Sequence, residues 1–278
     1  MKTNIQYKNS VFTTLFGNEE KIIELYGAIE GKVFPDDVDV QINTLTGALF
    51  LDRLNDVSFT IDNKLVVLVE HQASLNENMP LRCLLYITRL YEQILKSKNI
   101  YKKSLLKIPT PEFIVLYNGA DEYPDKKKLK LSDAFKIQGK EIDLELTVKV
   151  FNINKGHNIE ITKRSKTLDD YIFFIDRIRG NLKSGMTLEN AITESIKFCI
   201  ANGIMRDFLE TNGSEVTNML FVEFNMDDAL EVAREEGFEK GIEEGIEKAA
   251  RNLKESGALS NEQISQVLGL AVEAIEGL

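Results

Sequence analysis

Two acidic residues, Asp56 and Glu70, stand in a pattern that suits a metal ion. The chain between them alternates polar and apolar residues around Asp62-Asn-Lys64, a turn sequence, and so predicts a β-hairpin. A three-residue loop over these turn residues would place Asp56 directly opposite Glu70. Opposed like charges destabilise a sheet, and a divalent cation between them removes the repulsion. The pair therefore predicts a site for Mg²⁺ or Mn²⁺, with the backbone carbonyl of His71 as a further oxygen ligand.

This hairpin register also predicts how the two faces of the sheet differ. One face carries only apolar pairs, and the opposite face carries the polar residues Asp56, Ser58, Thr60, Glu70 and Gln72. Two other interpretations stay open, because a two-residue turn would offset the acids and because isolated acids in strands are often solvated edge residues. If a metal ion binds here, it can polarise a phosphodiester and make a bound water more acidic.

The elements that must position these residues follow from the periodicity of the apolar residues. A helix over 19–30 precedes the hairpin, and a long helix with Pro80 in its first turn follows it, through about Lys96. The Lys126–Lys130 segment has the composition of a solvated loop. The remaining predicted elements are strands over 57–61, 65–69, 113–117 and 143–151, and helices over 168–179, 188–201, 205–209 and 216–224. This order predicts an α/β core with a helical second half.

A basic stripe accompanies the long helix after the hairpin. It consists of Arg82, Arg89, Lys96 and Lys103, which are seven residues apart and would share one face of a helix. Such a face could position the phosphate backbone of DNA, although solvated helices commonly carry basic residues without binding anything. The stripe gains significance only beside an active centre.

Composition and charge exclude several classes of protein. The net charge is −10, but residues 223–278 alone carry 14 acidic and 5 basic residues, so the acidity belongs to the tail and does not argue against a DNA partner. No apolar run reaches membrane-spanning length and no phosphate-binding Gly-rich motif occurs, which predicts a cytoplasmic protein without a membrane or NTP partner. The two cysteines, Cys83 and Cys199, lie in apolar helical contexts and are expected to be free and buried. Two histidines without paired cysteines make a zinc site improbable.

The acidic tail has a regular pattern of small residues. Gly237, Gly241 and Gly245 recur every four residues, beside an apolar stripe. Glycine inside a helix costs about 1 kcal/mol relative to alanine, so close packing against a second helix would offset its cost. One interpretation is a homodimer through this tail, and an equally weighted alternative is a partly helical acidic linker. Residues 260–277 are similar to part of a helix-turn-helix, but their acidity favours a packing or oligomerisation module over base recognition.

Several segments together resemble a known nuclease family. An Asp on one strand, Glu-x-Gln on the next strand and a following helix resemble the PD-(D/E)xK nuclease superfamily. The segments Asn55–Phe59, Glu70–Gln72, Asn78–Arg82 and Pro109–Gly119 resemble, more narrowly, the Rpn-type recombination-promoting nucleases, also described as PD-(D/E)xK family transposases. The resemblance covers nearly the whole chain.

The resemblance implies roles for individual residues. Asp56 and Glu70 would be metal ligands, and Gln72 would occupy the position of the superfamily lysine. Gln72 can orient a water or a phosphate oxygen, but it is neutral and cannot stabilise charge as a lysine does. An acid that the family often has near the N-terminus is missing, and Glu20 or Glu24 on the first helix could replace it.

These observations predict a PD-(D/E)xK restriction-endonuclease-like α/β fold: a central mixed sheet flanked by helices, a helical second half and a C-terminal helical tail. The expected division is a nuclease-like core over 1–155, a helical extension over 156–225 and an acidic tail over 226–278. The expected function is a metal-dependent DNA endonuclease in which Asp56, Glu70 and Gln72 are catalytic. A structure-specific nuclease differs only in substrate. The alternative is a DNA-binding or assembly protein that has kept the fold without efficient catalysis.

Overall fold

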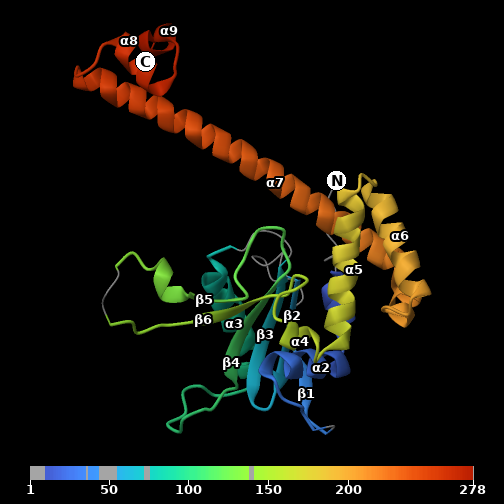
Figure 1. Ribbon diagram of the computed structural model, residues 1–278. Coiled ribbons are helices and arrows are strands. Elements are labelled where there is room, and N and C mark those ends of the chain that lie inside the picture. The colour runs from blue at the N-terminus through green and yellow to red at the C-terminus, as the bar shows by residue number, and fades with distance from the viewer. Residues whose placement is uncertain (1–9, 36, 44–54, 72–75, 138–140, 278) are drawn as a thin grey trace, which may run out of the picture. The chain divides into compact units, whose positions relative to one another are not determined.

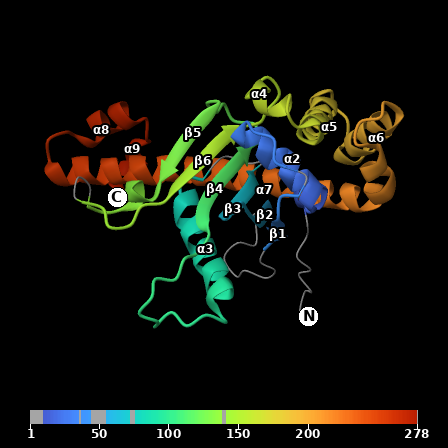
Figure 2. The ribbon, with the colours of Figure 1, turned by 90° about the horizontal axis from the view of Figure 1, so that it is seen from below.

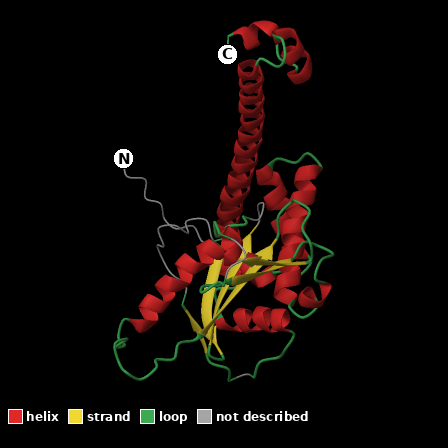
Figure 3. Cartoon of the chain, turned by 90° about the vertical axis from the view of Figure 1, so that its left-hand side faces the viewer, coloured by secondary structure: helices red, strands yellow, loops and turns green. Residues whose placement is uncertain are grey.

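A computed structural model describes residues 10–35, 37–43, 55–71, 76–137 and 141–277. The backbone alone is described for residues 55–56, 68–71, 226–240, 243–244, 273 and 276. Six strands form one mixed sheet, in the order β1-β2-β3-β4-β6-β5. Helices lie on both sides of this sheet (Figure 3). The strands are β1 (Val40–Ile42), β2 (Asn55–Ile61), β3 (Lys64–His71), β4 (Thr110–Tyr117), β5 (Lys126–Lys130) and β6 (Thr147–Asn152). The three strands β3, β4 and β6 are parallel to one another, and the other pairings are antiparallel. The predicted α/β class with a central mixed sheet is therefore confirmed.

Two strands differ from the sequence prediction. The short strand β1 was not predicted, and the Lys126–Lys130 segment, expected to be a solvated loop, forms the edge strand β5. Of the five residues in β5 only Leu129 is buried. Lysines on an exposed edge strand discourage pairing with other chains, so a basic composition is compatible with a strand at this place.

The turn of the β2–β3 hairpin has two residues, which corrects the predicted three-residue loop. Ile61 pairs with Lys64, and the turn residues Asp62 and Asn63 both have positive φ angles, of 47° and 58°. Two residues with positive φ match a type I′ turn, whose twist fits the twist of paired strands, and Asp and Asn tolerate this conformation better than most residues. The register of the whole hairpin is shifted by one residue from the predicted register.

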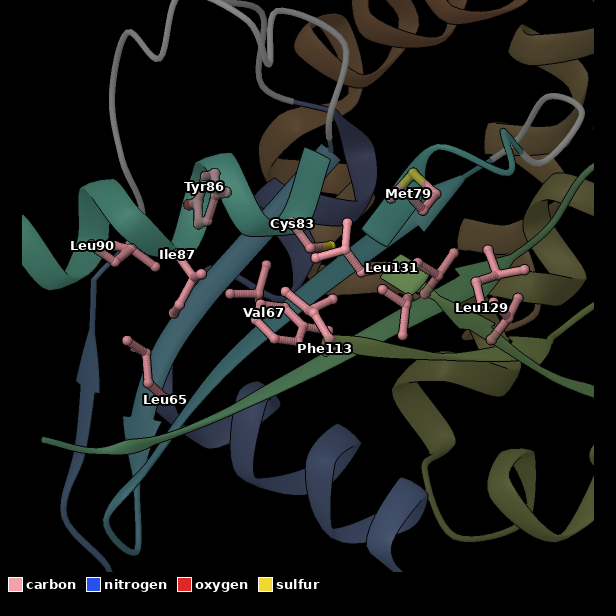
Figure 4. Packing of buried hydrophobic residues seen from close by; sticks show 14 of the residues in the cluster. Leu65, Val67, Met79, Cys83, Tyr86, Ile87, Leu90, Phe113, Leu129 and Leu131 are labelled. Atoms are coloured by element: carbon pink, nitrogen blue, oxygen red, sulfur yellow. The ribbon is translucent and has the colours of Figure 1, made fainter. Parts of the chain in front are cut away.

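The helix α3 (Met79–Leu95) covers one face of the sheet. Its apolar side chains meet those of β3, β4 and β6 in a closed cluster, and Figure 4 shows several of them between the helix and the strands. Ser58 belongs to this face: it is fully buried, and its hydroxyl lies 3.1 Å from the Tyr86 hydroxyl. The prediction that Ser58 lies on a polar face of the hairpin is therefore wrong, because Ser58 pairs with the buried Val67.

The opposite face of the sheet is covered by helices from both halves of the first 200 residues. They include α1 (Val11–Leu15), α2 (Glu19–Glu30), α4 (Ile159–Thr162) and α5 (Lys166–Lys183). Figure 2 shows α2 and α3 on different sides of the sheet. The Phe12 ring packs edge-on against Tyr171 at 5.8 Å, and Tyr26 packs in the same way on Phe59 at 5.6 Å. Both faces of the central strands are thus buried, so these strands read as nearly continuous apolar runs.

A cluster of charged side chains fastens α2 to this face at the beginning of the parallel strands. Glu112 on β4, only 8% exposed, accepts hydrogen bonds from Tyr26 at 2.6 Å, from Lys64 at 3.1 Å and from Lys149. Lys64 also contacts Glu30 at 3.3 Å. Burial by itself raises the pKa of Glu112, but the hydrogen bonds from its three partners outweigh this effect and bring the pKa to about 2.

The chain continues in helices, as predicted, but with one difference. After α5 come α6 (Leu188–Ala201) and α7 (Arg206–Ser256), a single helix of 51 residues. The sequence predicted two separate helices interrupted at Gly213, whereas α7 runs through this glycine without a break. One glycine costs a helix only about 1 kcal/mol, which the neighbouring turns can offset. Neither of the two cysteines, Cys83 and Cys199, is in a disulfide bond, and both are buried, as expected.

Internal contacts divide the chain into two compact units, Met1–Glu223 and Phe224–Leu278 (Figure 1). In the second unit α8 (Asn261–Leu268) and α9 (Val272–Glu276) form a small core with the end of α7, centred on Ala250, Ile264 and Ile275. Ser260 begins α8 with the predicted capping box. The expected separation of a nuclease-like core from a helical extension at residue 155 stays a prediction. Among the described residues no helix is long and apolar enough to span a membrane.

The Glu112 cluster predicts a specific loss of stability. Glu112→Gln should lower the free energy of unfolding at pH 7 by on the order of 3 kcal/mol, because it removes a buried charge that three donors stabilise. The matched control is Glu77→Gln, which removes a more exposed ion pair with Lys127 and should cost less than about 1 kcal/mol. Urea denaturation of the two variants measures both values.

The pH dependence of this effect has a definite sign. Because folding lowers the pKa of Glu112, its contribution is complete above the pKa of the unfolded chain, about 4.5, and is lost as the pH falls toward about 2. The stability difference between wild type and Glu112→Gln should therefore narrow over this range. A difference that stays constant from pH 6 to pH 3 would contradict the assigned role of Glu112.

Candidate functional site

The sheet brings the two predicted metal ligands to the same edge. Parallel strands β3, β4 and β6 end there together, with His71 paired to Tyr117 and Tyr117 paired to Asn152. Because β2 is antiparallel to β3, its first residues lie at the edge where β3 ends. Asp56 is the second residue of β2 and Glu70 is the last but one of β3, so both backbone positions belong to this carboxyl edge.

The register corrects the predicted direct pairing of the two acids. Asp56 pairs with Val69, and Glu70 pairs with Asn55, so the acids are offset by one position. This offset is a consequence of the two-residue turn. In an unbroken pleat neighbouring positions alternate between the two faces, so one shared ion requires a local departure from regular pairing, such as a bulge. Strand ends beside active sites are places where bulges re-aim a side chain.

The side chains of Asp56, Glu70 and His71 lie outside what the structure describes, as does Gln72 entirely. Their assignment as metal ligands and catalytic residues therefore stays a prediction. Their chemistry suits a hard divalent ion, since carboxylate and carbonyl oxygens are the ligands that Mg²⁺ and Mn²⁺ favour. Among the described residues no cluster of three or more His, Cys, Asp or Glu side chains offers another metal site.

An arginine fixed by neutral oxygens stands at the carboxyl edge of β4, the strand beside β3. Arg179 on α5 donates from Nη1 to the Asn118 side chain at 3.0 Å and to Asn154 Oδ1 at 3.4 Å, and from Nη2 to the Asn118 carbonyl. Asn154 in turn donates to the Gly119 carbonyl at 3.0 Å. The guanidinium thus ties α5 to the ends of β4 and β6.

The charge of Arg179 is not balanced by a carboxylate among the described residues that it contacts. A cation held in place by neutral acceptors keeps its positive potential, which favours anions such as phosphate. Arg179 is not among the residues predicted from the sequence. Its helix is amphipathic and its partners are 61 and 25 residues away in the chain, so no local pattern signals the contact.

Gly119 shows how tightly this edge is packed. A Cβ atom at this position would lie 2.5 Å from the Tyr117 hydroxyl, so only glycine fits after Asn118. The Tyr117 hydroxyl donates to the Asp121 carbonyl at 3.0 Å, and burial raises the pKa of Tyr117. One buried donor, the Asn118 side-chain amide, has no acceptor among the described residues.

The predicted basic stripe is only partly helical. Arg82 and Arg89 lie on α3, and Lys96 is the residue that caps its C-terminus. Lys103 lies beyond the end of the helix, in the segment that leads to β4, so the prediction of a single helical face with four basic residues is wrong at Lys103. The helix stops because residues 96–99 carry polar side chains and contribute no further apolar face.

Glu24, which the sequence offered as an accessory ligand, has a structural role. Its carboxylate accepts hydrogen bonds from the Ser165 hydroxyl at 2.8 Å and from the Thr167 backbone and hydroxyl at 2.9 and 2.7 Å. Partial burial raises its pKa, but these hydrogen bonds and Lys21 outweigh burial and lower the pKa overall. Glu24 therefore fastens α2 to the start of α5. Glu20 is exposed.

The arrangement defines a class of fold: a mixed sheet between helices, with two acids at the carboxyl edge of a central hairpin, consistent with a PD-(D/E)XK nuclease-like core. A family model described as PD-(D/E)XK nuclease family transposase matches residues 11–205. The match covers more than half of the chain, so the chain belongs to this family, as its sequence motifs indicated. Comparisons with curated proteins and with solved structures gave no match.

The Arg179 contacts generate a prediction about the edge itself. Arg179→Gln should lower the free energy of unfolding by about 1 to 3 kcal/mol, because the Asn118 and Asn154 oxygens lose a charged donor in a partly buried place. Thermal and urea denaturation measure the change. The control is Lys155→Gln, which removes an exposed ion pair with Asp176 and should change stability by less than about 1 kcal/mol. Equal effects of the two substitutions would show that Arg179 does not organise the edge.

Proposed function

We propose that this protein is a DNA endonuclease that depends on a divalent metal, Mg²⁺ or Mn²⁺. In this proposal Asp56 and Glu70 bind the ion and the backbone carbonyl of His71 completes the protein ligands. The observation that supports it is that the backbone positions of Asp56 and Glu70 lie at one edge of the sheet, in a chain that belongs to a nuclease family. When bound, the ion would polarise the scissile phosphodiester and lower the pKa of a bound water.

Other residues of the site would orient the attacking water and stabilise the charge of the phosphate. Gln72 would orient the attacking water or a phosphate oxygen, because its amide both donates and accepts hydrogen bonds. Since Gln72 carries no charge, a cation elsewhere must stabilise the negative charge that develops on the phosphate. Arg179 is held at the carboxyl edge of the strand next to β3, and its charge suits this task.

Basic side chains of α3, which covers the face of the sheet opposite α5, would hold the DNA backbone. Arg82, Arg89 and Lys96 follow α3 from its first turn to its C-terminus, over a helix of 17 residues. At 1.5 Å per residue this helix is about 25 Å long, enough to follow several phosphates of one strand. Lys103 would extend this surface beyond the helix.

A second candidate function is a DNA-binding or assembly protein with little or no catalytic activity. Two observations favour it: Gln72 replaces the lysine of the superfamily, and the hairpin register offsets the two acids. If the strand ends stay regular, Asp56 and Glu70 would lie on different faces and could not share an ion. DNA affinity would survive this loss, because phosphate contacts do not need the metal.

The C-terminal stripe supports a proposal about assembly, namely a homodimer through α7. Gly241 and Gly245 are exposed, and an added Cβ at either position would meet no described atom within 4 Å. Ile242 beside them is 47% exposed. A second copy of α7 could pack closely against this small, apolar stripe and offset the cost of its glycines.

Plasmid cleavage distinguishes the two functions. With Mg²⁺ or Mn²⁺ the wild type should nick or linearise supercoiled plasmid, and EDTA should abolish the reaction. Asp56→Asn and Glu70→Gln, which keep size and lose charge, should each lower the rate at least about 100-fold, since a bound metal contributes several kcal/mol to transition-state stabilisation. The matched control is Asp62→Asn, which removes a carboxylate from the far end of the same hairpin and suits its positive φ.

The alternative function predicts another pattern in the same assay. Residual nicking that is equal in wild type, Asp56→Asn and Glu70→Gln would come from a contaminant. Together with unchanged plasmid binding by all three proteins, that result would reject the endonuclease and support the non-catalytic function.

Light scattering of the full chain tests the proposed dimer. The wild type should have the mass of a dimer, and Gly241→Leu with Gly245→Leu should convert it to a monomer by keeping the helices apart. Gly213→Leu is the control, because it adds the same side chain to another open position of α7. A wild-type monomer, or a dimer that survives the double substitution, would contradict the assignment of the stripe.

A further inference from the structure

The segment between α3 and β4 has an unusual surface. We call residues 96–109 the lysine loop; all of its residues except Leu106 and Pro109 are exposed. Figure 2 shows it extending away from the sheet between the end of α3 and the start of β4. Its end is fixed, because the Tyr91 hydroxyl donates to the Pro109 carbonyl at 2.8 Å and the next backbone amide, of Thr110, donates to Asn63 at 2.9 Å.

The lysine loop is strongly basic in an acidic protein. It contains Lys96, Lys98, Lys102, Lys103 and Lys107, and the chain has no acid between Glu92 and Glu112. None of these five lysines forms an ion pair with a described residue. Because no described carboxylate pairs with them, their joint positive potential is available to attract a polyanion.

Large apolar side chains stand among these lysines. Tyr101 is 90% exposed and Leu105 is 87% exposed, with Ile100 at 58% and Ile108 at 43%. Single exposed apolar residues are ordinary, but four within nine residues of one loop are a concentration typical of binding surfaces. A turn presents Tyr101: its backbone amide donates to the Asn99 side chain at 3.0 Å.

Lysines beside exposed apolar side chains suit a ligand that carries both negative charges and flat apolar surfaces. Nucleic acid combines phosphates, which need cations, with bases, whose flat faces stack on aromatic rings. In a regular duplex the base faces are covered by their neighbours, so Tyr101 would find a partner only where bases are unstacked. We infer that the lysine loop binds unpaired bases of a nucleic acid, with Tyr101 as the stacking residue.

This inference rests on the proposed function for the identity of the ligand and adds the kind of substrate. In Figure 4 Leu90 lies toward the Leu65 end of β3 and Met79 toward the other end, so α3 runs back along β3 and the loop begins far from Glu70. Six steps of β3 separate Lys64 from Glu70, about 20 Å. At the duplex spacing of about 3.4 Å per nucleotide this distance corresponds to about six nucleotides, so the lysine loop would contact the nucleic acid away from the proposed cleavage site.

Fluorescence anisotropy in EDTA tests the inference without any cleavage. The probes are a labelled 25-nucleotide oligo(dT) and a labelled duplex of the same length. Tyr101→Ala should weaken oligo(dT) binding by about fivefold or more and should change duplex binding less than about twofold. Tyr101→Phe keeps the ring and should bind both probes as the wild type does. The double substitution Lys102→Gln with Lys103→Gln should weaken the binding of both probes, because both contain phosphates.

Val33→Ala is the control, because Val33 is a 97% exposed apolar residue outside the loop. It should leave both affinities unchanged, and all variants should melt as the wild type does. If Tyr101→Ala weakens the binding of both probes equally, or of neither probe, stacking on unpaired bases is rejected. If it instead lowers binding to vesicles of four parts neutral to one part anionic lipid and leaves DNA binding intact, the ligand is a membrane surface and the inference is wrong.

Plasmid cleavage by the same preparations separates this inference from the proposed function. If the wild type cleaves plasmid and Tyr101→Ala binds oligo(dT) as the wild type does, base binding by the lysine loop is rejected and the proposed endonuclease activity stands. If Tyr101→Ala selectively loses oligo(dT) binding but the wild type cuts no plasmid with either metal, base binding by the lysine loop is supported and the endonuclease activity is rejected.

Discussion

The register of the β2–β3 hairpin is the constraint on which the rest of the account depends. A two-residue turn with positive φ at Asp62 and Asn63 fixes which residues face each other along the whole ladder. The same register buries Ser58 against Tyr86 and brings Asp56 and Glu70 to one edge with an offset of one position. A slip of one residue between the two strands would exchange the faces of the β2 side chains relative to those of β3. The condition for catalysis is therefore local: the strand ends must depart from the regular pleat that the turn imposes.

The two ends of the parallel strands have different tasks. At their beginning, the charges around Glu112 are paired with one another and fasten α2 to the sheet, so they offer nothing to a ligand. At their carboxyl ends, Arg179 is held by neutral oxygens and keeps its charge available for an anion. This division follows the general behaviour of α/β sheets, in which ligands bind outside the carboxyl ends of the strands. The placement of Asp56 and Glu70 at this end agrees with it.

The sequence predicted much of this fold and less of the site. The helix with Cys83 and Tyr86 could be predicted because burial of one side imposes a helical period on its apolar residues. The strand with Leu65–Val67 could be predicted because burial of both faces makes it a short continuous apolar run. The basic edge strand β5 could not be predicted, because one buried leucine among lysines gives no apolar period. The turn was readable in principle, since Asp and Asn favour positive φ, but the two-residue and three-residue loops both give a plausible apolar pairing. Arg179 depends on contacts between distant segments, which no local pattern reveals.

The most direct test of the central claim is a diffraction measurement on crystals grown with Mn²⁺, using the anomalous scattering of manganese. The account predicts one manganese at the carboxyl edge of the hairpin, bonded to carboxylate oxygens of both Asp56 and Glu70 at about 2.2 Å, with the regular pairing interrupted beside them. A manganese bound by only one of these acids, or two acids on opposite faces of an unbroken sheet with no metal between them, would contradict it.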